Sequence, residues 1–231
     1  MPKDISGVYL RNGPNPKYIP SNGRQHWFDG DSMIHAIRIK DGKLQYSNKY
    51  AMTDRLKEEI KHDKPLMVRT NELQSGMHGL MKMGIYELYK AIGYVPEFEQ
   101  FKDGNANTAF VNHANKTYAL NEQNFPFEIE IPKSDQEFDI KSKGFKSFGE
   151  QLNHNVSAHP KVDRKKKELI TYGYDLFGKD GTNLKYTLFD KDNNKINELG
   201  IPLRGPVMIH DIAITETNVV FNDLPMQFKP E

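Results

Sequence analysis

The chain has 231 residues, enough for one sizeable domain or two small ones. Its 32 lysines and arginines nearly balance its 31 aspartates and glutamates, so no basic excess indicates a nucleic-acid partner. It has no cysteine, which excludes a disulfide scaffold, a thiolate metal site and a cysteine nucleophile.

Short strands separated by turns are the dominant pattern along the chain. The first clear pair is Met33–Ile39 and Leu44–Tyr46, joined by a turn that contains Asp41-Gly42. An Asp-Gly turn between two strands is typical of a β-hairpin. Three more pairs are predicted, in order Thr108–Val111 with Thr117–Leu120, Val156–His159 with Glu168–Tyr174, and Ile209–Ile214 with Val219–Phe221.

One segment between the first two hairpins departs from this pattern. Residues 75–92 have few strand signals and are rich in methionine and other apolar side chains. We expect a short helical insertion packed on the sheets. The alternative is an apolar segment that lines a substrate entrance or touches a lipid surface, since methionine adapts to irregular apolar partners.

The hairpins recur at a long and nearly constant interval. Leu120 and Tyr172 are 52 positions apart, and Tyr172 and Phe221 are 49 apart. A hairpin that recurs about every 40 to 50 residues is typical of β-propeller blades. A β-sandwich, the alternative, gives turn signals every 8 to 12 residues without a longer period. We therefore predict an all-β fold, with residues 1–231 forming part of one β-propeller domain. The charged run Lys161–Lys167 is interpreted as a turn between strands rather than a phosphate site.

Two of the eight histidines occupy matched positions in successive repeats. His159 and His210 are 51 residues apart, each at the start of a predicted blade. The innermost strands of a propeller converge on its axis, so imidazoles placed there could share a metal ion, and neutral imidazole suits iron, zinc, copper and nickel. The alternative is a pair of histidines that only hydrogen-bond to the backbone, and the spacing leaves both interpretations open.

Localisation is predicted from what the sequence lacks. No apolar run approaches the roughly 20 residues that a membrane-spanning helix needs. The first five residues carry no apolar stretch of the kind found in a secretory signal. We therefore expect a cytoplasmic protein, with at most peripheral contact with membranes.

Five sequence blocks closely resemble those of the carotenoid oxygenase family, which includes carotenoid cleavage dioxygenases, stilbene-cleaving relatives and retinoid isomerases. They occur in the family's order and span almost the whole chain: Gly7–Pro16, His26–His35, Asn107–Phe110, Ala158–Asp163 and Met208–Thr215. One departure is Ser32, where the family block usually has glycine. The chain is similar to the N-terminal part of this family.

The resemblance implies a seven-bladed propeller with a ferrous ion, Fe(2+), on its axis, held by four histidines. His159 and His210 match the first two of these ligands. Glu122 matches a carboxylate that orients a liganding imidazole, here that of His210. Without the resemblance, Glu122 would be interpreted as a surface strand residue.

The resemblance also implies a reaction and its partners. A dioxygenase of this kind adds dioxygen across a carbon–carbon double bond of a carotenoid, apocarotenoid or similar conjugated substrate and yields two carbonyl products. Such an uncharged, apolar small molecule needs an apolar tunnel to the metal rather than an ionic clamp.

Nothing in the sequence matches the family's third and fourth histidine ligands. We therefore expect about the first half of the blades, and a chain that is inactive by itself. It would be a fragment, a truncated product, or a chain that completes its ring with another. The alternative function is a non-catalytic β-propeller segment that binds apolar ligands or another protein. Retention of His159, His210 and Glu122 argues against that alternative.

Overall fold

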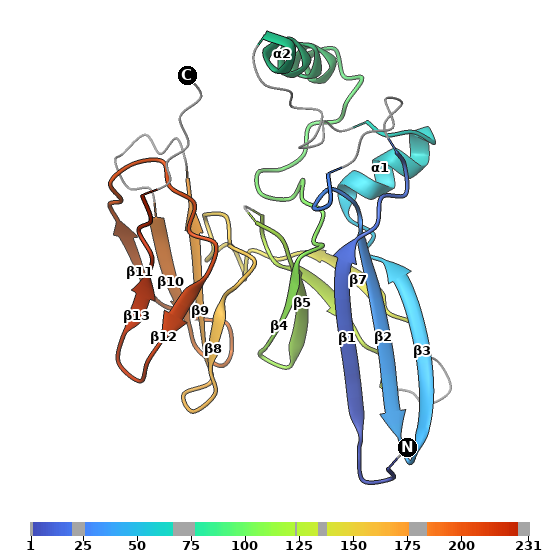
Figure 1. Ribbon diagram of the computed structural model, residues 1–231, viewed down its shortest axis with the longest axis vertical. Helices are drawn as coiled ribbons and strands as arrows, with labels where there is room; N and C mark the ends of the chain where they lie inside the picture. The colour runs from blue at the N-terminus through green and yellow to red at the C-terminus, as the bar shows by residue number, and fades with distance from the viewer. Residues whose placement is uncertain are drawn as a thin grey trace.

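The computed structural model describes residues 2–19, 26–66, 77–122, 124–133, 138–175 and 184–225. Within them the chain forms four antiparallel sheets and two helices. Figure 1 shows the sheets side by side, with α1 and α2 above the same end of them. The first sheet contains β1 (Gly7–Pro14), β2 (Ser32–Lys40) and β3 (Lys43–Tyr50). The second contains β4 (Ala109–His113), β5 (Lys116–Leu120), β6 (Phe127–Glu130) and β7 (Lys141–Phe145). The third contains β8 (Lys161–Asp163), β9 (Glu168–Tyr174), β10 (Leu184–Phe189) and β11 (Lys195–Ile201). The fourth pairs β12 (Ile212–Ile214) with β13 (Val219–Phe221).

Each sheet is a meander of consecutive strands, as expected for a propeller blade. The turn from β2 to β3 is the predicted Asp41-Gly42, and both residues have the positive φ that a tight hairpin requires. In the predicted long repeat, Leu120, Tyr172 and Phe221 lie on β5, β9 and β13, the second strands of successive sheets. The predicted long repeat is therefore confirmed by the second strands of successive blades, whereas the first predicted hairpin forms the second and third strands of its sheet.

An apolar cluster fills each boundary between neighbouring sheets. Ile34 on β2 packs with Phe127 and Ile129 on β6. The next boundary is formed by ten buried residues from the second and third sheets and their connecting loop: Val111, Tyr118, Leu120, Phe125, Phe148, Leu152, Val156, Ala158, Leu169 and Phe189. The third boundary holds Ile170, Tyr172, Tyr174, Leu184, Val207, Ile209 and Ile212. Strand β9 contributes to both of the last two clusters because alternate side chains point to opposite faces of a sheet.

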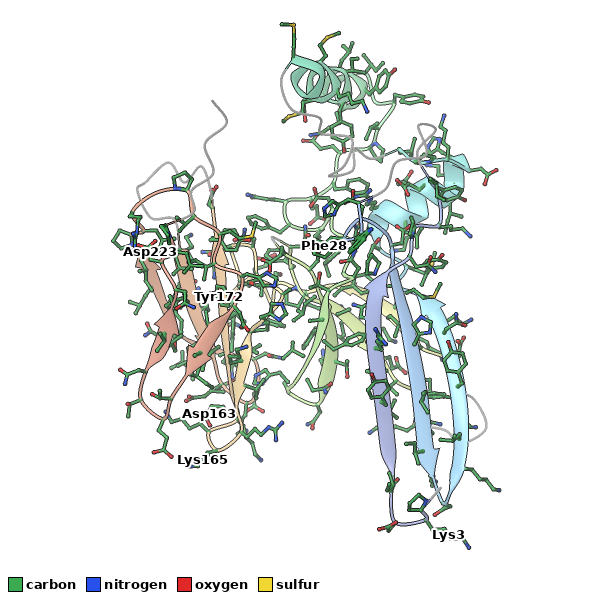
Figure 2. All side chains as sticks on the ribbon, viewed as in Figure 1. Lys3, Phe28, Asp163, Lys165, Tyr172 and Asp223 are labelled. Carbon is green, nitrogen blue, oxygen red and sulfur yellow. The ribbon has the colours of Figure 1, made fainter. Side chains whose placement is uncertain are left out.

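Two asparagines, one from the Gly7–Pro16 block and one from the Asn107–Phe110 block, join the first two blades. Asn12 donates from Nδ2 to the carbonyl of Ala106 at 2.6 Å. Asn107 donates in the opposite direction, to the carbonyls of Gly30 at 2.7 Å and Phe28 at 3.2 Å. Phe28 is labelled in Figure 2 between the sheets and the helices. Amide side chains from two of the resemblance blocks thus cross the boundary between these blades in both directions.

Two sequence predictions of strands need correction. Val156–His159 is not a strand, because β8 begins only at Lys161. Pro160 has no N–H to donate to a ladder, and the N–H groups of Val156 and Ser157 bond instead to Asn124 and Tyr172. Similarly, β12 begins at Ile212 rather than at residue 209.

The two helices differ in how well the sequence predicts them. Helix α2 (Met77–Ala91) occupies most of the predicted insertion, whose residues 75 and 76 lie outside the described part. Helix α1 (Asp54–His62) was not predicted, although Thr53 provides a normal N-cap by accepting a hydrogen bond from the N–H of Leu56. Within the described part of the chain, neither helix has the length and hydropathy to cross a membrane.

Candidate metal centre

His159 and His210 are brought together although 51 residues separate them in the chain. Each lies two positions before the first strand of its sheet, β8 for His159 and β12 for His210. Their Nε2 atoms are 3.2 Å apart, and the two rings meet edge to face with centroids 4.6 Å apart. The matched positions in successive blades therefore bring two imidazole nitrogens within 3.2 Å of each other.

Glu122 lies directly beside this pair. It follows β5 in the second blade, and its Oε1 is 2.9 Å from Nδ1 of His210. The carboxylate is largely buried, with 24% of its side chain exposed, whereas 60% of the His210 side chain is exposed. An Nδ1–H that donates to the carboxylate leaves Nε2 of His210 with a free lone pair directed towards His159.

The electrostatics of the three side chains follow from burial and proximity. Burial raises the pKa of the Glu122 carboxyl, and the His210 imidazole and the hydroxyls of Tyr174 and Ser157 oppose that rise. Burial, followed by the neighbouring His210, lowers the pKa of His159. The neutral imidazole, which is the form that binds a metal, is thereby favoured at His159.

The two nitrogens suit a first-row metal ion. With metal–nitrogen bonds of about 2.1 Å, two ligands would be about 3.0 Å apart at a right angle and about 3.4 Å apart at a tetrahedral angle. The observed 3.2 Å separation lies between these values. The described residues contain no group of three or more histidine, aspartate, glutamate or cysteine side chains placed to hold a metal. Among the described residues, the nitrogens whose spacing fits a metal ion are therefore a pair, those of His159 and His210.

The remaining described histidines lie elsewhere and bond to protein groups. His35 contacts the hydroxyl of Tyr46 within the first blade, at 2.6 Å. His113 contacts the carbonyl of Asp190 at 2.7 Å, and the buried His154 lies 2.6 Å from the hydroxyl of Thr187. His26 contacts the N–H of Phe28. His62 lies on α1, and the side chain of His78 is outside the described part.

Three hydroxyl-bearing residues around Glu122 were missed by the sequence analysis. Tyr174 donates to Oε2 of Glu122 at 3.2 Å, and Ser157 lies 3.3 Å from Oε1. Tyr172 donates to the main-chain carbonyl of His210 at 2.8 Å. The available signal was the alternation on β9, which puts Tyr172 and Tyr174 on the same face, and the position of Ser157 two residues before His159.

Comparison with known proteins identifies the family. A family model described as retinal pigment epithelial membrane protein matches residues 1–231. Carotenoid 9,10(9',10')-cleavage dioxygenase 1 of Arabidopsis thaliana is 36% identical over 231 residues, which is all of this chain and 41% of that protein. A chloroplastic 9-cis-epoxycarotenoid dioxygenase of the same plant is 35% identical over 99% of this chain and 38% of its own length.

A solved structure shows the same fold. Lignostilbene dioxygenase from Pseudomonas brassicacearum superimposes with a TM-score of 0.79 at 24% identity, over 99% of this chain and 43% of that chain. The prediction of part of a seven-bladed propeller is thereby confirmed. The chain spans about two fifths of the length of these curated relatives. Since the family model covers every residue, the chain belongs to the carotenoid oxygenase family, whose model carries the description retinal pigment epithelial membrane protein.

Proposed function

We propose that this chain supplies two of the ligands of a non-haem iron(II) centre, and the carboxylate that orients one of them, in a carotenoid-cleaving dioxygenase. The observation that carries the proposal is the 3.2 Å approach of the His159 and His210 Nε2 atoms, with Glu122 on Nδ1 of His210. Membership of a family with carotenoid cleavage dioxygenases among its relatives supports the substrate class.

The chain's own residues would bind and orient. His159 and His210 would hold the metal through Nε2, and Glu122 would fix the ring orientation and raise the basicity of His210. Ferrous iron would supply dioxygen activation, by which a carbon–carbon double bond of an apolar conjugated substrate becomes two carbonyl groups. A complete four-histidine centre would need two ligands beyond those found here, so we expect the isolated chain not to cleave carotenoids.

Metal binding at this point can be tested by NMR on the 231-residue chain with labelled histidine side chains. Ferrous iron, titrated without oxygen, should broaden the imidazole signals of His159 and His210 before those of other histidines, because it is paramagnetic. His159→Ala should remove this selectivity. The control is His35→Ala, which removes an imidazole that contacts Tyr46 in the first blade.

Two results would contradict the proposal. The first is broadening that begins at other histidines, or that is unchanged in His159→Ala, since either would place the metal elsewhere. The second is carotenoid cleavage by the chain alone at a rate unaffected by His159→Ala. That result would contradict both the role of the pair and the predicted inactivity.

A second candidate function, a segment that binds apolar partners such as a membrane surface, is favoured by α2. Met81, Met83 and Leu88 on this helix are 59%, 52% and 57% exposed. If this surface contacts lipid, Leu88→Ser should reduce co-sedimentation of the chain with phosphatidylcholine vesicles. Leu44→Ser is a matched control, because Leu44 is 56% exposed on β3. Equal effects of the two substitutions, or no sedimentation of the unmodified chain, would refute this function.

A further inference from the structure

The hydroxyls of Ser157, Tyr172 and Tyr174 form one hydrogen-bonded group at the boundary between the third and fourth blades. Ser157 Oγ lies 3.0 Å from the hydroxyl of Tyr172 and 3.3 Å from both Oε1 of Glu122 and the carbonyl oxygen of His210. Tyr172 donates to the same carbonyl at 2.8 Å. Tyr174 donates to the other carboxylate oxygen of Glu122. The group therefore contacts both the carboxylate of Glu122 and the main chain of His210, the candidate ligand.

These three residues are shielded from water. Ser157, Tyr172 and Tyr174 are 1%, 0% and 2% exposed. Tyr172 is labelled in Figure 2 within the sheet that contains β9. If a buried hydroxyl loses its hydrogen-bond partner, no water molecule can replace that partner. Each hydrogen bond in this group therefore constrains the side-chain geometry more than a hydrogen bond at the surface would.

The protons can be assigned consistently. An ionised Glu122 only accepts, so Nδ1–H of His210 and the hydroxyl of Tyr174 donate to its two oxygens. The proton of Tyr172 goes to the His210 carbonyl, the shortest of these bonds. The single Ser157 proton then goes to Tyr172 or to Glu122. In this arrangement His210 carries its proton on Nδ1 and offers Nε2 to the metal.

We propose that Ser157, Tyr172 and Tyr174 are positioning residues that hold Glu122 and the His210 main chain, and so keep His210 in the Nδ1–H tautomer with Nε2 facing His159. The three hydroxyls all come from the blade of His159, and they act on the ligand of the next blade. The proposal rests on the proposed metal centre, but its structural consequence exists without metal. In this arrangement Glu122 orients His210, and the three hydroxyls orient Glu122.

The test is the tautomer of His210 in the metal-free chain, measured from its imidazole nitrogen shifts by NMR. The spectra are recorded at about pH 8.5, roughly two units above the ordinary pKa of a free histidine. The unmodified chain should show the Nδ1–H form in excess. Tyr174→Phe should reduce the ratio of the Nδ1–H form to the Nε2–H form about fivefold, which is the change in an equilibrium that the loss of one typical hydrogen bond produces. Ser157→Ala should shift it in the same direction.

Tyr186→Phe is the matched control, since it removes a phenolic hydroxyl from β10 in the same sheet and keeps the ring that contacts Phe221. It should leave the His210 tautomer unchanged. Backbone amide spectra establish that each variant is folded. The proposal is overturned if His210 is mainly Nε2–H in the unmodified chain, or if folded Tyr174→Phe and Ser157→Ala match the control. Failure of the iron titration alone would refute the metal centre and leave this measurement standing.

Discussion

Gly173 lies where the loop that carries His159 crosses strand β9, and replacing it by alanine should be severely destabilising. A Cβ at this position would lie 1.8 Å from the carbonyl oxygen of Asn155 and 2.3 Å from its Oδ1. The loop is fastened on both sides of Gly173. Asn155 donates from Nδ2 to the Tyr174 carbonyl at 2.8 Å, and the N–H of Ser157 donates to the Tyr172 carbonyl at 2.7 Å.

The magnitude follows from these contacts. Moving the Asn155 carbonyl from 1.8 Å to an ordinary 3.4 Å contact requires a shift of 1.6 Å. Overpacking of this kind costs about 1 to 3 kcal/mol. Strain on the two anchoring hydrogen bonds adds about 1 kcal/mol. We therefore expect Gly173→Ala to lower the free energy of unfolding by about 3 kcal/mol.

Urea denaturation monitored by circular dichroism measures this loss. With a slope of about 2 kcal/mol per molar urea, the midpoint should fall by about 1.5 M. Gly13→Ala is the control, because a Cβ there meets nothing within 4 Å, and its effect should stay within about 0.5 kcal/mol. The reasoning is refuted if Gly173→Ala unfolds at the same urea concentration as this control while the His159 resonances remain unchanged.

Three further predictions concern other parts of the chain. Burial lowers the pKa of His154, so the unfolded chain takes up a proton below about pH 6.5 that the folded chain does not. The free energy of unfolding should therefore fall as the pH drops from 7 to 5. His154→Gln should make this pH dependence weaker, as measured by urea titrations at several pH values. An unchanged pH dependence would show that His154 does not contribute. Asn107→Ala removes the two bonds to the Gly30 and Phe28 carbonyls and should cost about 2 kcal/mol in the same assay, whereas a loss below about 0.5 kcal/mol would contradict a cross-blade role. Thr53→Ala removes the N-cap of α1 and should cost about 1 kcal/mol, with Thr217→Ala in the exposed turn between β12 and β13 as a control expected to have little effect.

The sequence was informative where local chemistry decides structure. The Asp41-Gly42 turn and the alternation on β2 depend on neighbouring residues, so the first hairpin could be predicted with its turn. The interval from Leu120 to Tyr172 to Phe221 is set by the size of a repeating unit, and the length of a repeat can be counted directly along the sequence. Helix α1 was missed because its nine residues carry mostly charged side chains, and burial of Leu56 decides its position.

The sequence by itself determined that this is a β-propeller segment in which His159 and His210 occupy matched positions, and the family motifs added Glu122. Only the tertiary structure decided that the two Nε2 atoms lie 3.2 Å apart and that Glu122 reaches Nδ1 of His210. The physical reason is that these contacts join residues from three different blades. Their geometry depends on how apolar clusters pack the sheets against one another, and on loop bonds such as that from Ser157 to Tyr172, which no periodicity in the sequence records.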